Sequence, residues 1–265
     1  MASDWLVAIP SYKRAKTIQR KTLRVLREGG VDASRVHIFV SSAEEMDEYV
    51  AEYHSEYKPN IIVGQPGIHR QREFIHQFFP EGQRLVCMDD DVTAIKTLYP
   101  GVPLPILLTE MFRIGVEQGC ALIGVYPSDN GLSMKDRAVK GLVYVIGSFF
   151  LMVNWHGASY PSQTTEDFTR TLLAWKEGRG VLRFEGIAPT TRYFREPGGL
   201  QTYRTEDIQE REMKALVDAW PGLAIPRYKH GKYMDVRLKR KVDDVFNKPF
   251  QTLRPKKDDG AAAAS

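Results

Sequence analysis

The stretch Leu85-Val86-Cys87-Met88-Asp89-Asp90-Asp91 decides how the rest of this 265-residue chain is interpreted. Its apolar run has the length of a buried strand. Three adjacent carboxylates at the end of a strand repel one another, so a cation is expected beside them. Hard oxygen ligands on a rigid element suit Mg²⁺ or Mn²⁺, and these metals usually bind a substrate diphosphate as well. The alternative is a solvated acidic turn, although turns seldom need three acids in a row.

On the N-terminal side of this stretch, short apolar runs alternate with segments of helical periodicity. They predict strands at 6–9, 36–40 and 61–63, and helices at about 17–29, 42–54 and 69–78. This alternation indicates βαβ units and a parallel sheet, in which ligands bind beyond the carboxyl ends of the strands. The loops at 11–12, 67–69 and 89–91 are therefore expected to converge on one place.

The C-terminal side has a different pattern. It predicts helices at 104–118, 165–177 and 206–220, strands at 121–126 and 181–184, and a hairpin of 141–146 with 149–153. The polar, glycine-bearing loop 195–204 is a candidate lid. No repeat and no clear linker interrupts the chain, which predicts a single domain.

Composition is that of an ordinary globular protein, with 43% hydrophobic and 26% charged residues. No apolar run approaches the length of a membrane span, and the first residues do not resemble a signal peptide. Cys87 and Cys120 lie in apolar surroundings, which indicates buried thiols in a reducing compartment. A cytoplasmic protein without a membrane partner is therefore expected, in the bacterial host if the chain is phage-encoded. Its oligomeric state is left open.

Positive charge is concentrated near the C-terminus. Residues 227–257 contain eleven Lys and Arg against three Asp, interleaved with four aromatic residues. This pattern indicates a polyanionic partner such as nucleic acid, whereas the commoner meaning of a charge run is a solvated surface. The Ala-rich end, residues 256–265, is expected to be disordered.

The order of these motifs resembles the GT-A fold of nucleotide-sugar glycosyltransferases. The resemblance rests on Ala8-Ile9-Pro10-Ser11-Tyr12, Gly67-Ile68-His69-Arg70-Gln71-Arg72, Asp89-Asp90-Asp91, Glu166-Asp167 and His230. It spans residues 5–235 and implies an α/β fold, with a Rossmann-type central sheet and helices on both faces. The implied halves of this one domain are 1–100 for the nucleotide sugar and 101–255 for the acceptor.

A narrower likeness is to the phage glycosyltransferases associated with TET/JBP oxygenases. It rests on the stretches 67–72 and 88–91, the loop 198–201 and the basic end. That group glycosylates hydroxymethylated pyrimidines in DNA. The chain departs from the usual pattern at Gln71 and Glu73, where a small residue and Asn normally flank the arginine. The sequence leaves open the sugar, and whether the base is hydroxymethyluracil or hydroxymethylcytosine.

The resemblance implies a metal-dependent, inverting transfer of a sugar from a UDP-sugar, with glucose as the default. The implied ligands of Mn²⁺ or Mg²⁺ are Asp91, Asp89 and His230. Asp167 is the first choice of general base and Glu166 the second. Contacts to the nucleotide sugar are expected from Pro10, Ser11, Tyr12, Arg14, Gly67, Arg70, Arg72, Asp89, Asp90 and Lys232.

Each of these residues also has a plainer interpretation. Acids at a helix start stabilise its first turn whatever the function. Lone arginines are often solvated, Tyr12 could pack against the following helix, and His230 could be an exposed histidine. An extrahelical base could stack on the aromatic residues between 149 and 160, or these could pack in the core.

Three alternatives to a DNA glycosyltransferase remain at this point. The acceptor could be a polysaccharide, lipid or protein. The chain could be a nucleic-acid-binding module with an incidental acidic turn. A nucleotidyltransferase would also use strand-end carboxylates and metals, but no glycine-rich phosphate loop with a lysine follows the first strand.

Overall fold

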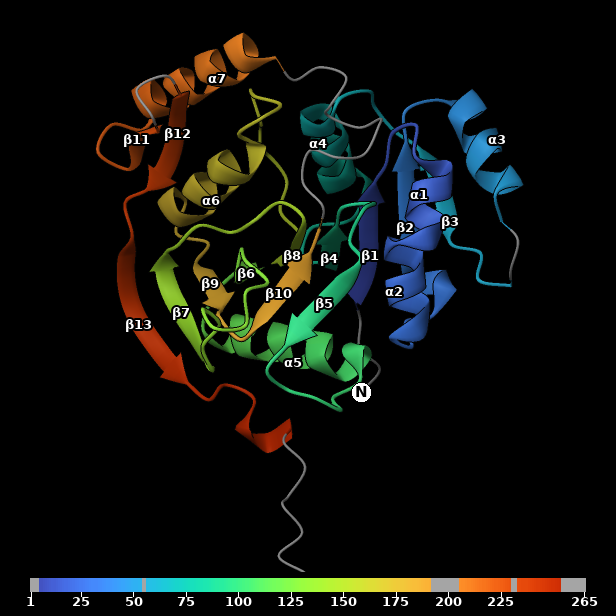
Figure 1. The fold of residues 1–265 in the computed structure, drawn as a ribbon, viewed down its shortest axis with the longest axis horizontal. Helices are drawn as coiled ribbons and strands as arrows, with labels where there is room; N and C mark the ends of the chain where they lie inside the picture. Colours follow the sequence, from blue (N-terminus) through green and yellow to red (C-terminus); the bar gives the residue numbers. More distant parts are fainter. Residues whose placement is uncertain (1–4, 54–55, 192–204, 230–232, 254–265) are drawn as a thin grey trace, which may run out of the picture.

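A nine-stranded mixed sheet runs through the molecule (Figure 1). The computed structural model describes residues 5–53, 56–191, 205–229 and 233–253. The strands of this sheet, in spatial order, are β13 (Lys241–Asn247), β7 (Arg137–Leu142), β9 (Val181–Phe184), β6 (Leu122–Val125), β8 (Phe149–Val153), β4 (Arg84–Met88), β1 (Trp5–Pro10), β2 (Val36–Val40) and β3 (Asn60–Val63). Two small antiparallel pairs join β5 (Ala94–Thr97) to β10 (Ile187–Thr190), and β11 (Ala224–Lys229) to β12 (Tyr233–Leu238).

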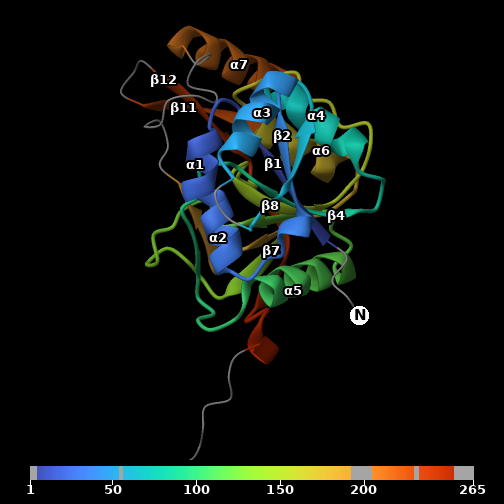
Figure 2. The same ribbon diagram turned by 90° about the vertical axis from the view of Figure 1, so that its right-hand side faces the viewer.

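Helices cover both faces of the sheet. They are α1 (Ala15–Arg20), α2 (Thr22–Glu28), α3 (Ala43–Ala51), α4 (Ile68–Phe78), α5 (Leu104–Glu117), α6 (Glu166–Lys176) and α7 (Glu206–Ala219). In Figure 2, β1 and β2 lie between α1 and α2 on one side and α4 and α6 on the other. The expected α/β fold, with helices on both faces of one central sheet in a single domain, is confirmed.

The N-terminal part follows the sequence prediction closely. Strands β4, β1, β2 and β3 are parallel and in the order that βαβ units produce. The first expected helix is broken at Lys21, whose φ of −116° and ψ of −93° separate α1 from α2. Ser42 caps α3 by accepting from the backbone N–H of Glu45.

Two hydrophobic cores explain why these strands read as continuous apolar runs. Val86 and Met88 of β4 pack with α2 and α5, whereas Leu85 and Cys87 pack with α4 on the other face. Strand β8 alternates in the same way, so Phe149 and Phe150 are buried in opposite cores. A third cluster of buried residues joins α6, α7 and the β11–β12 pair.

The predicted hairpin of 141–146 with 149–153 is wrong. Strands β7 and β8 are separated in the sheet by β9 and β6, and residues 143–148 form the segment between them. The segment is apolar because Val143 and Val145 fill the core under α6. This apolar run has the same pattern in the sequence as a buried strand. Val145 N–H donates to Thr171 Oγ1 at 3.3 Å, and Asp89 N–H donates to Ser148 O at 3.0 Å. This segment therefore crosses the carboxyl end of β4.

Strands β5, β10, β11, β12 and β13 were not predicted. Strand β13 is almost wholly exposed and its acids follow one another, so it has neither alternation nor an apolar run. Phe250, one of the aromatic residues in the basic end, is fully buried with its ring 4.7 Å from that of Tyr99. No helix in the described parts of the chain is long and apolar enough to cross a membrane.

Candidate active site

A cavity of about 720 Å³ opens at the carboxyl ends of β1 and β4. Its lining includes eleven of the residues predicted for the site, namely Pro10, Ser11, Tyr12, Arg14, Gly67, Arg72, Asp89, Asp90, Asp91, Glu166 and Asp167. Arg70 is exposed and is not among the described lining residues. His230 and Lys232 lie outside the described residues, as do the candidate lid 195–204 and the end 256–265. The three predicted loops thus meet at one edge of the sheet.

Asp90 is the acid at the end of β4 that faces into the protein. It is 4% exposed, and its Oδ2 accepts from Ser11 Oγ at 2.6 Å. Its Oδ1 accepts from Arg14 Nη1 at 2.8 Å, and the same nitrogen lies 3.6 Å from Asp91 Oδ2. Thr22 fixes the same strand end, because its hydroxyl donates to Asp89 O at 2.7 Å. Asp90 therefore ties the loop after β1 to the loop after β4.

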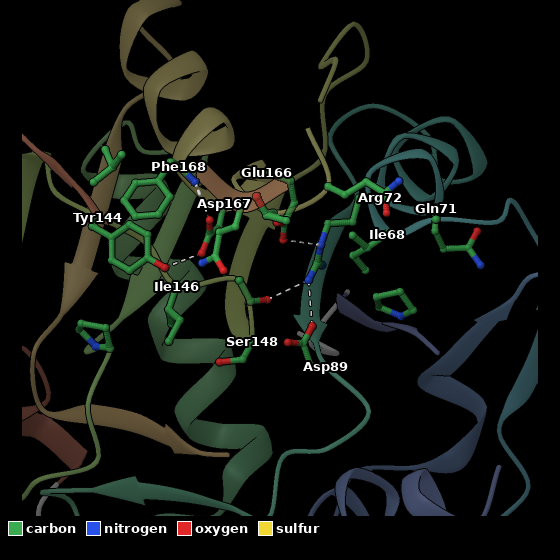
Figure 3. A pocket seen from close by; sticks show the side chains of 18 of the residues that line it. Ile68, Gln71, Arg72, Asp89, Tyr144, Ile146, Ser148, Glu166, Asp167 and Phe168 are labelled. Atoms are coloured by element: carbon green, nitrogen blue, oxygen red, sulfur yellow. Dashed lines mark hydrogen bonds and ion pairs between the residues drawn. The ribbon is translucent and has the colours of Figure 1, made fainter. Parts of the chain in front are cut away.

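Arg72 joins the two acidic parts of the cavity (Figure 3). Its buried guanidinium donates from Nη2 to Asp89 Oδ1 at 2.9 Å and to Gly147 O at 3.0 Å. Its Nε lies 3.3 Å from Glu166 Oε1 at the start of α6. A buried arginine has to be paired with carboxylates in this way, so the end of β4 and the start of α6 are fixed relative to each other.

Gln71 is one of the positions where the chain departs from the pattern of the resembled family, and its side chain holds the backbone of a loop in this structure. Its side-chain amide donates to Val40 O at 3.1 Å and accepts from Gln65 N–H at 2.7 Å. A Cβ on Gly64 would lie 2.1 Å from the Gln71 side-chain oxygen, so the glycine permits this contact. Gln71 thus holds the loop after β3, which leads into Gly67 and α4.

The two acids at the start of α6 have different surroundings. Glu166 is 7% exposed, and burial together with the charge of Asp167 raises its pKa to about 7, against the lowering by Arg72 and Arg170. Asp167 is half-buried; its Oδ1 accepts from Phe168 N–H at 2.8 Å, and its Oδ2 accepts from the hydroxyl of Tyr144. Asp167 is therefore the more accessible of the two, and Tyr144 orients it.

Charge is unbalanced at this end of the cavity. Partial burial raises the pKa of Asp89 to about 7, and repulsion from Asp91 and Asp90 adds to the effect of burial, while Arg72 opposes it. Arg14 and Arg72 are the arginines that contact the acids here. Because neighbouring carboxylates repel the charged form of Asp89, a further positive charge would be stabilised here.

The carboxylates after β4 fit a divalent cation that is shared with a substrate, and they do not enclose one by themselves. Among the described residues, no group of three or more His, Cys, Asp or Glu is arranged to hold a metal. Asp91 and Asp89 line the cavity, and each is within reach of one arginine, Arg14 or Arg72. Mg²⁺ is commonly bound by one or two carboxylates together with substrate phosphates, and two carboxylates that line the cavity suit that arrangement.

Several residues of the site were missed by sequence reasoning. Tyr144 and Ser148 come from the segment 143–148, which the sequence presented as a hairpin, and Ser148 Oγ is buried without a hydrogen-bond partner among the described residues. Phe168 and Arg183 also line the cavity. No local signal could have found these residues, because each is a single residue brought in by the fold. Arg237 and Arg240 line the cavity as well, and they belong to the basic region 227–257 for which the sequence predicts a polyanionic partner.

The aromatic residues proposed to stack on a base lie in the core instead. Phe149, Phe150, Trp155 and Tyr160 are each exposed by 2% or less. Phe150 is covered by the Arg170 guanidinium, whose carbon lies 3.7 Å from the ring centre. They are buried because the strand alternation of β8 and the underside of α4 surround them. Of the residues that the structure describes, Tyr12, Tyr144 and Phe168 are the aromatic ones that line the cavity.

No protein-family model matches the chain, and no curated protein matches its sequence. Solved structures resemble it at low identity. "Crystal Structure of a Mycobacterial Protein" has a TM-score of 0.52 and 11% identity, over 96% of this chain and 91% of that one. Glucosyl-3-phosphoglycerate synthase from Mycobacterium tuberculosis, with Mn²⁺, UDP and glucosyl-3-phosphoglycerate, has a TM-score of 0.48 and 10% identity, over 94% and 91%. The same synthase with Mg²⁺ and UDP has a TM-score of 0.48 and 11% identity, over 94% and 91%. The first of these likenesses shows that the chain shares its fold with a known structure, and at such identities the evidence on chemistry has to come from the cavity itself.

Proposed function

We propose that this protein is a metal-dependent, inverting glycosyltransferase that moves a sugar from a UDP-sugar to the hydroxymethyl group of a modified pyrimidine in phage DNA. Glucose is the default sugar, and the base is 5-hydroxymethyluracil or 5-hydroxymethylcytosine. Residues 1–100 would bind the nucleotide sugar and residues 101–255 the acceptor. The synthase complexes described above hold UDP and a divalent metal, but the proposal is carried by this chain's own cavity.

The observation that carries the proposal is the position of Arg72 between Asp89 and Glu166. It brings a strand-end carboxylate cluster and the acids at a helix start together at one end of the cavity. Sugar transfer needs both: a place for cation and diphosphate, and a carboxylate that accepts the proton of the attacking hydroxyl. If the acids after β4 formed only a solvated turn, a buried arginine would not be paired with one of them.

In the proposed mechanism, Asp167 accepts the proton of the acceptor hydroxyl at a carboxylate oxygen. The Tyr144 hydroxyl and the Phe168 N–H each occupy one lone pair of that carboxylate and fix its direction. Glu166 stays paired with Arg72 and closes the floor of the cavity. A cation bound by Asp91 and Asp89 would neutralise the charge that develops on the leaving diphosphate. Attack from the Asp167 side, opposite the leaving group, inverts the sugar carbon.

The nucleic-acid part of the proposal rests on the basic side chains beside the cavity. Arg237 and Arg240 line it, and Arg227, Lys239 and Lys241 are exposed on the neighbouring strands and turn. Basic side chains with such exposure are suited to the phosphates of a nucleic acid. A hydroxymethyl group on a stacked base could not reach Asp167, so the target base would have to leave the helix.

The test is UDP release from UDP-glucose with Mn²⁺, in the presence of DNA carrying hydroxymethyluracil, hydroxymethylcytosine or unmodified bases. We expect release that requires a hydroxymethyl base and is lost in Asp91→Ala. An exposed acid away from the cavity, in Asp47→Ala, provides the matched control. Release that is independent of DNA would keep the transferase and remove the DNA acceptor. Tight DNA binding without release from any sugar nucleotide would contradict the enzyme and favour a binding module.

A further inference from the structure

A second charged cluster lies on the far side of the cavity from Asp89. Strand β9, which carries Arg183, is three strands away from β4 in the sheet. Arg183 Nη2 donates to Glu185 Oε1 at 2.7 Å, Arg137 Nε donates to Glu185 Oε2 at 2.6 Å, and Arg240 Nη2 lies 3.6 Å from Glu185 Oε1. We call these four residues the Glu185 cluster.

The Glu185 cluster carries three guanidinium groups and one carboxylate. Burial alone would raise the pKa of Glu185, but the hydrogen bonds from Arg183 and Arg137 lower it below the usual value. The carboxylate is therefore ionised at neutral pH and neutralises one of the three positive charges. Two positive charges remain next to a cavity. Solvent and salt weaken the attraction between an anion and these charges less in a cavity than on an open surface.

Arg183 connects this cluster to the reaction centre. Its Nη1 donates to Tyr144 O at 3.1 Å, and the hydroxyl of the same tyrosine donates to Asp167. Arg183 is 8% exposed and lines the cavity, yet its Nε is buried and has no hydrogen-bond partner among the described residues. The charge of Arg183 is paired with Glu185, but a buried donor without a hydrogen bond is costly, which a ligand oxygen beside this guanidinium would relieve.

The cavity wall beside Arg183 also carries a net positive charge. The described lining from β9, β12 and the turn after β12 contributes Arg183, Arg237 and Arg240 as bases and Asp235 as an acid. Arg240 is 48% exposed in its side chain, so it can turn toward a ligand without unfolding the turn. Guanidinium groups suit phosphate oxygens because they offer paired N–H donors in one plane.

We propose that the Glu185 cluster is a phosphate-binding subsite for the acceptor. The inference rests on the proposed function, because it places the acceptor's phosphate about one tyrosine side chain from the carboxylate of Asp167. Arg183 and Arg240 contact the phosphate, and Glu185 offsets part of the positive charge of the guanidinium groups. The phosphate belongs either to a DNA backbone or to a small phosphorylated acceptor.

Two substitutions with opposite expected signs test the subsite. Binding of inorganic phosphate is measured by calorimetry on the full chain with UDP and Mn²⁺ at saturation, so that the donor side is filled. Arg240→Ala is expected to weaken phosphate binding roughly tenfold, as for loss of one charge-assisted contact. Glu185→Gln is expected to strengthen it severalfold, because it removes the one carboxylate that neutralises the arginines.

Arg113→Ala is the matched control, because Arg113 is a half-exposed arginine on α5 that pairs with Glu110 and Glu117. It should leave phosphate binding unchanged. Thermal unfolding of each variant shows whether the fold is intact, and Arg240→Ala keeps the test valid if Glu185→Gln does not fold. Unchanged phosphate affinity in Arg240→Ala, or weakened affinity in a folded Glu185→Gln, overturns the subsite.

Two further readouts separate the subsite from the proposed function and identify the source of the phosphate. If the parent protein binds phosphate as expected but releases no UDP from any sugar nucleotide, the subsite stands and the function fails. If UDP is released but Arg240→Ala leaves the KM for the acceptor unchanged, the function stands and the subsite fails. Tighter binding of a short oligonucleotide than of hydroxymethyldeoxyuridine monophosphate supports a backbone phosphate, and the reverse order supports a small phosphorylated acceptor.

Discussion

The two ends of the cavity have opposite charge balances. At the end of β4 and the start of α6, Arg14 and Arg72 face five acids. At β9, three arginines share Glu185. Burial raises the pKa of Glu166 to about 7 at the first end, whereas hydrogen bonds from arginines overcome burial and lower the pKa of Glu185 at the second. Acids are therefore in excess at the first end and arginines are in excess at the second.

This difference suggests how one cavity could bind two anionic substrates without mixing them. A diphosphate brought with a cation is stabilised where acids are in excess, and a bare phosphate is repelled there. The reverse holds beside the Glu185 cluster. Tyr144 spans the two ends, because its carbonyl contacts Arg183 and its hydroxyl contacts Asp167.

The largest expected effect is on the acid-rich end, in Asp167→Asn. The amide cannot accept the proton of the acceptor hydroxyl, so kcat should fall by roughly 10²–10⁴-fold, the range for general-base catalysis. Glu166→Gln keeps a neutral partner next to Arg72 and should retain kcat within about tenfold of the parent. Steady-state UDP release from both variants checks this. A larger loss in Glu166→Gln than in Asp167→Asn would reverse the assignment of the base.

Next in size is the structural effect of Arg72→Met. It leaves Asp89 and Glu166 without their shared partner, and breaking a buried ion pair typically lowers the free energy of unfolding by about 3 kcal/mol or more. Arg70→Met, on the exposed face of the same helix, should change it by less than about 0.5 kcal/mol. Urea unfolding of the parent and both variants measures these differences in the free energy of unfolding. Similar losses in the two variants would mean that Arg72 does not join the walls of the cavity.

These two arginines also show what the sequence could and could not predict. The βαβ pattern and the strand-end acids placed the N-terminal loops correctly, because local periodicity and turn chemistry determine them. Arg70 and Arg72 were both candidates for contacts to the nucleotide sugar, and only the helix phase relative to the sheet separates the exposed residue from the buried one. Tyr144 and Arg183 could not be found at all, and Arg240 only as one of many basic residues, since they meet through β7, β9 and the exposed β13, whose pairing is non-local.

The pH dependence of stability should have opposite slopes at the two ends, measured without metal or nucleotide. The pKa of Glu166 is raised to about 7 from 4.5, so its contribution is fully present below pH 4.5 and is lost as pH rises through 7. Glu166→Gln should therefore gain stability relative to the parent between pH 5 and 8. The pKa of Glu185 is lowered from 4.5, so its contribution is present above pH 4.5 and is lost as pH falls.

Glu185→Gln should accordingly be less stable than the parent at pH 7, with a difference that shrinks in acid. Denaturant midpoints of the parent and both variants from about pH 3 to 8 provide the comparison. Parallel curves for the two variants would break the contrast between an acid-rich and an arginine-rich end, because both carboxylates would then have equivalent surroundings.

The smallest expected effect belongs to the residue that spans the two ends. Tyr144→Phe removes the hydroxyl that donates to Asp167 and keeps the ring, which packs 4.6 Å from that of Phe168. One hydrogen bond to a charged group corresponds to about tenfold, so kcat should fall by no more than that while the KM for the acceptor stays the same. Tyr228→Phe, an exposed tyrosine on β11, should leave kcat unchanged. If Tyr144→Phe instead raises the KM and spares kcat, the Tyr144 hydroxyl serves acceptor binding, and the orientation of Asp167 has to come from the Phe168 N–H alone.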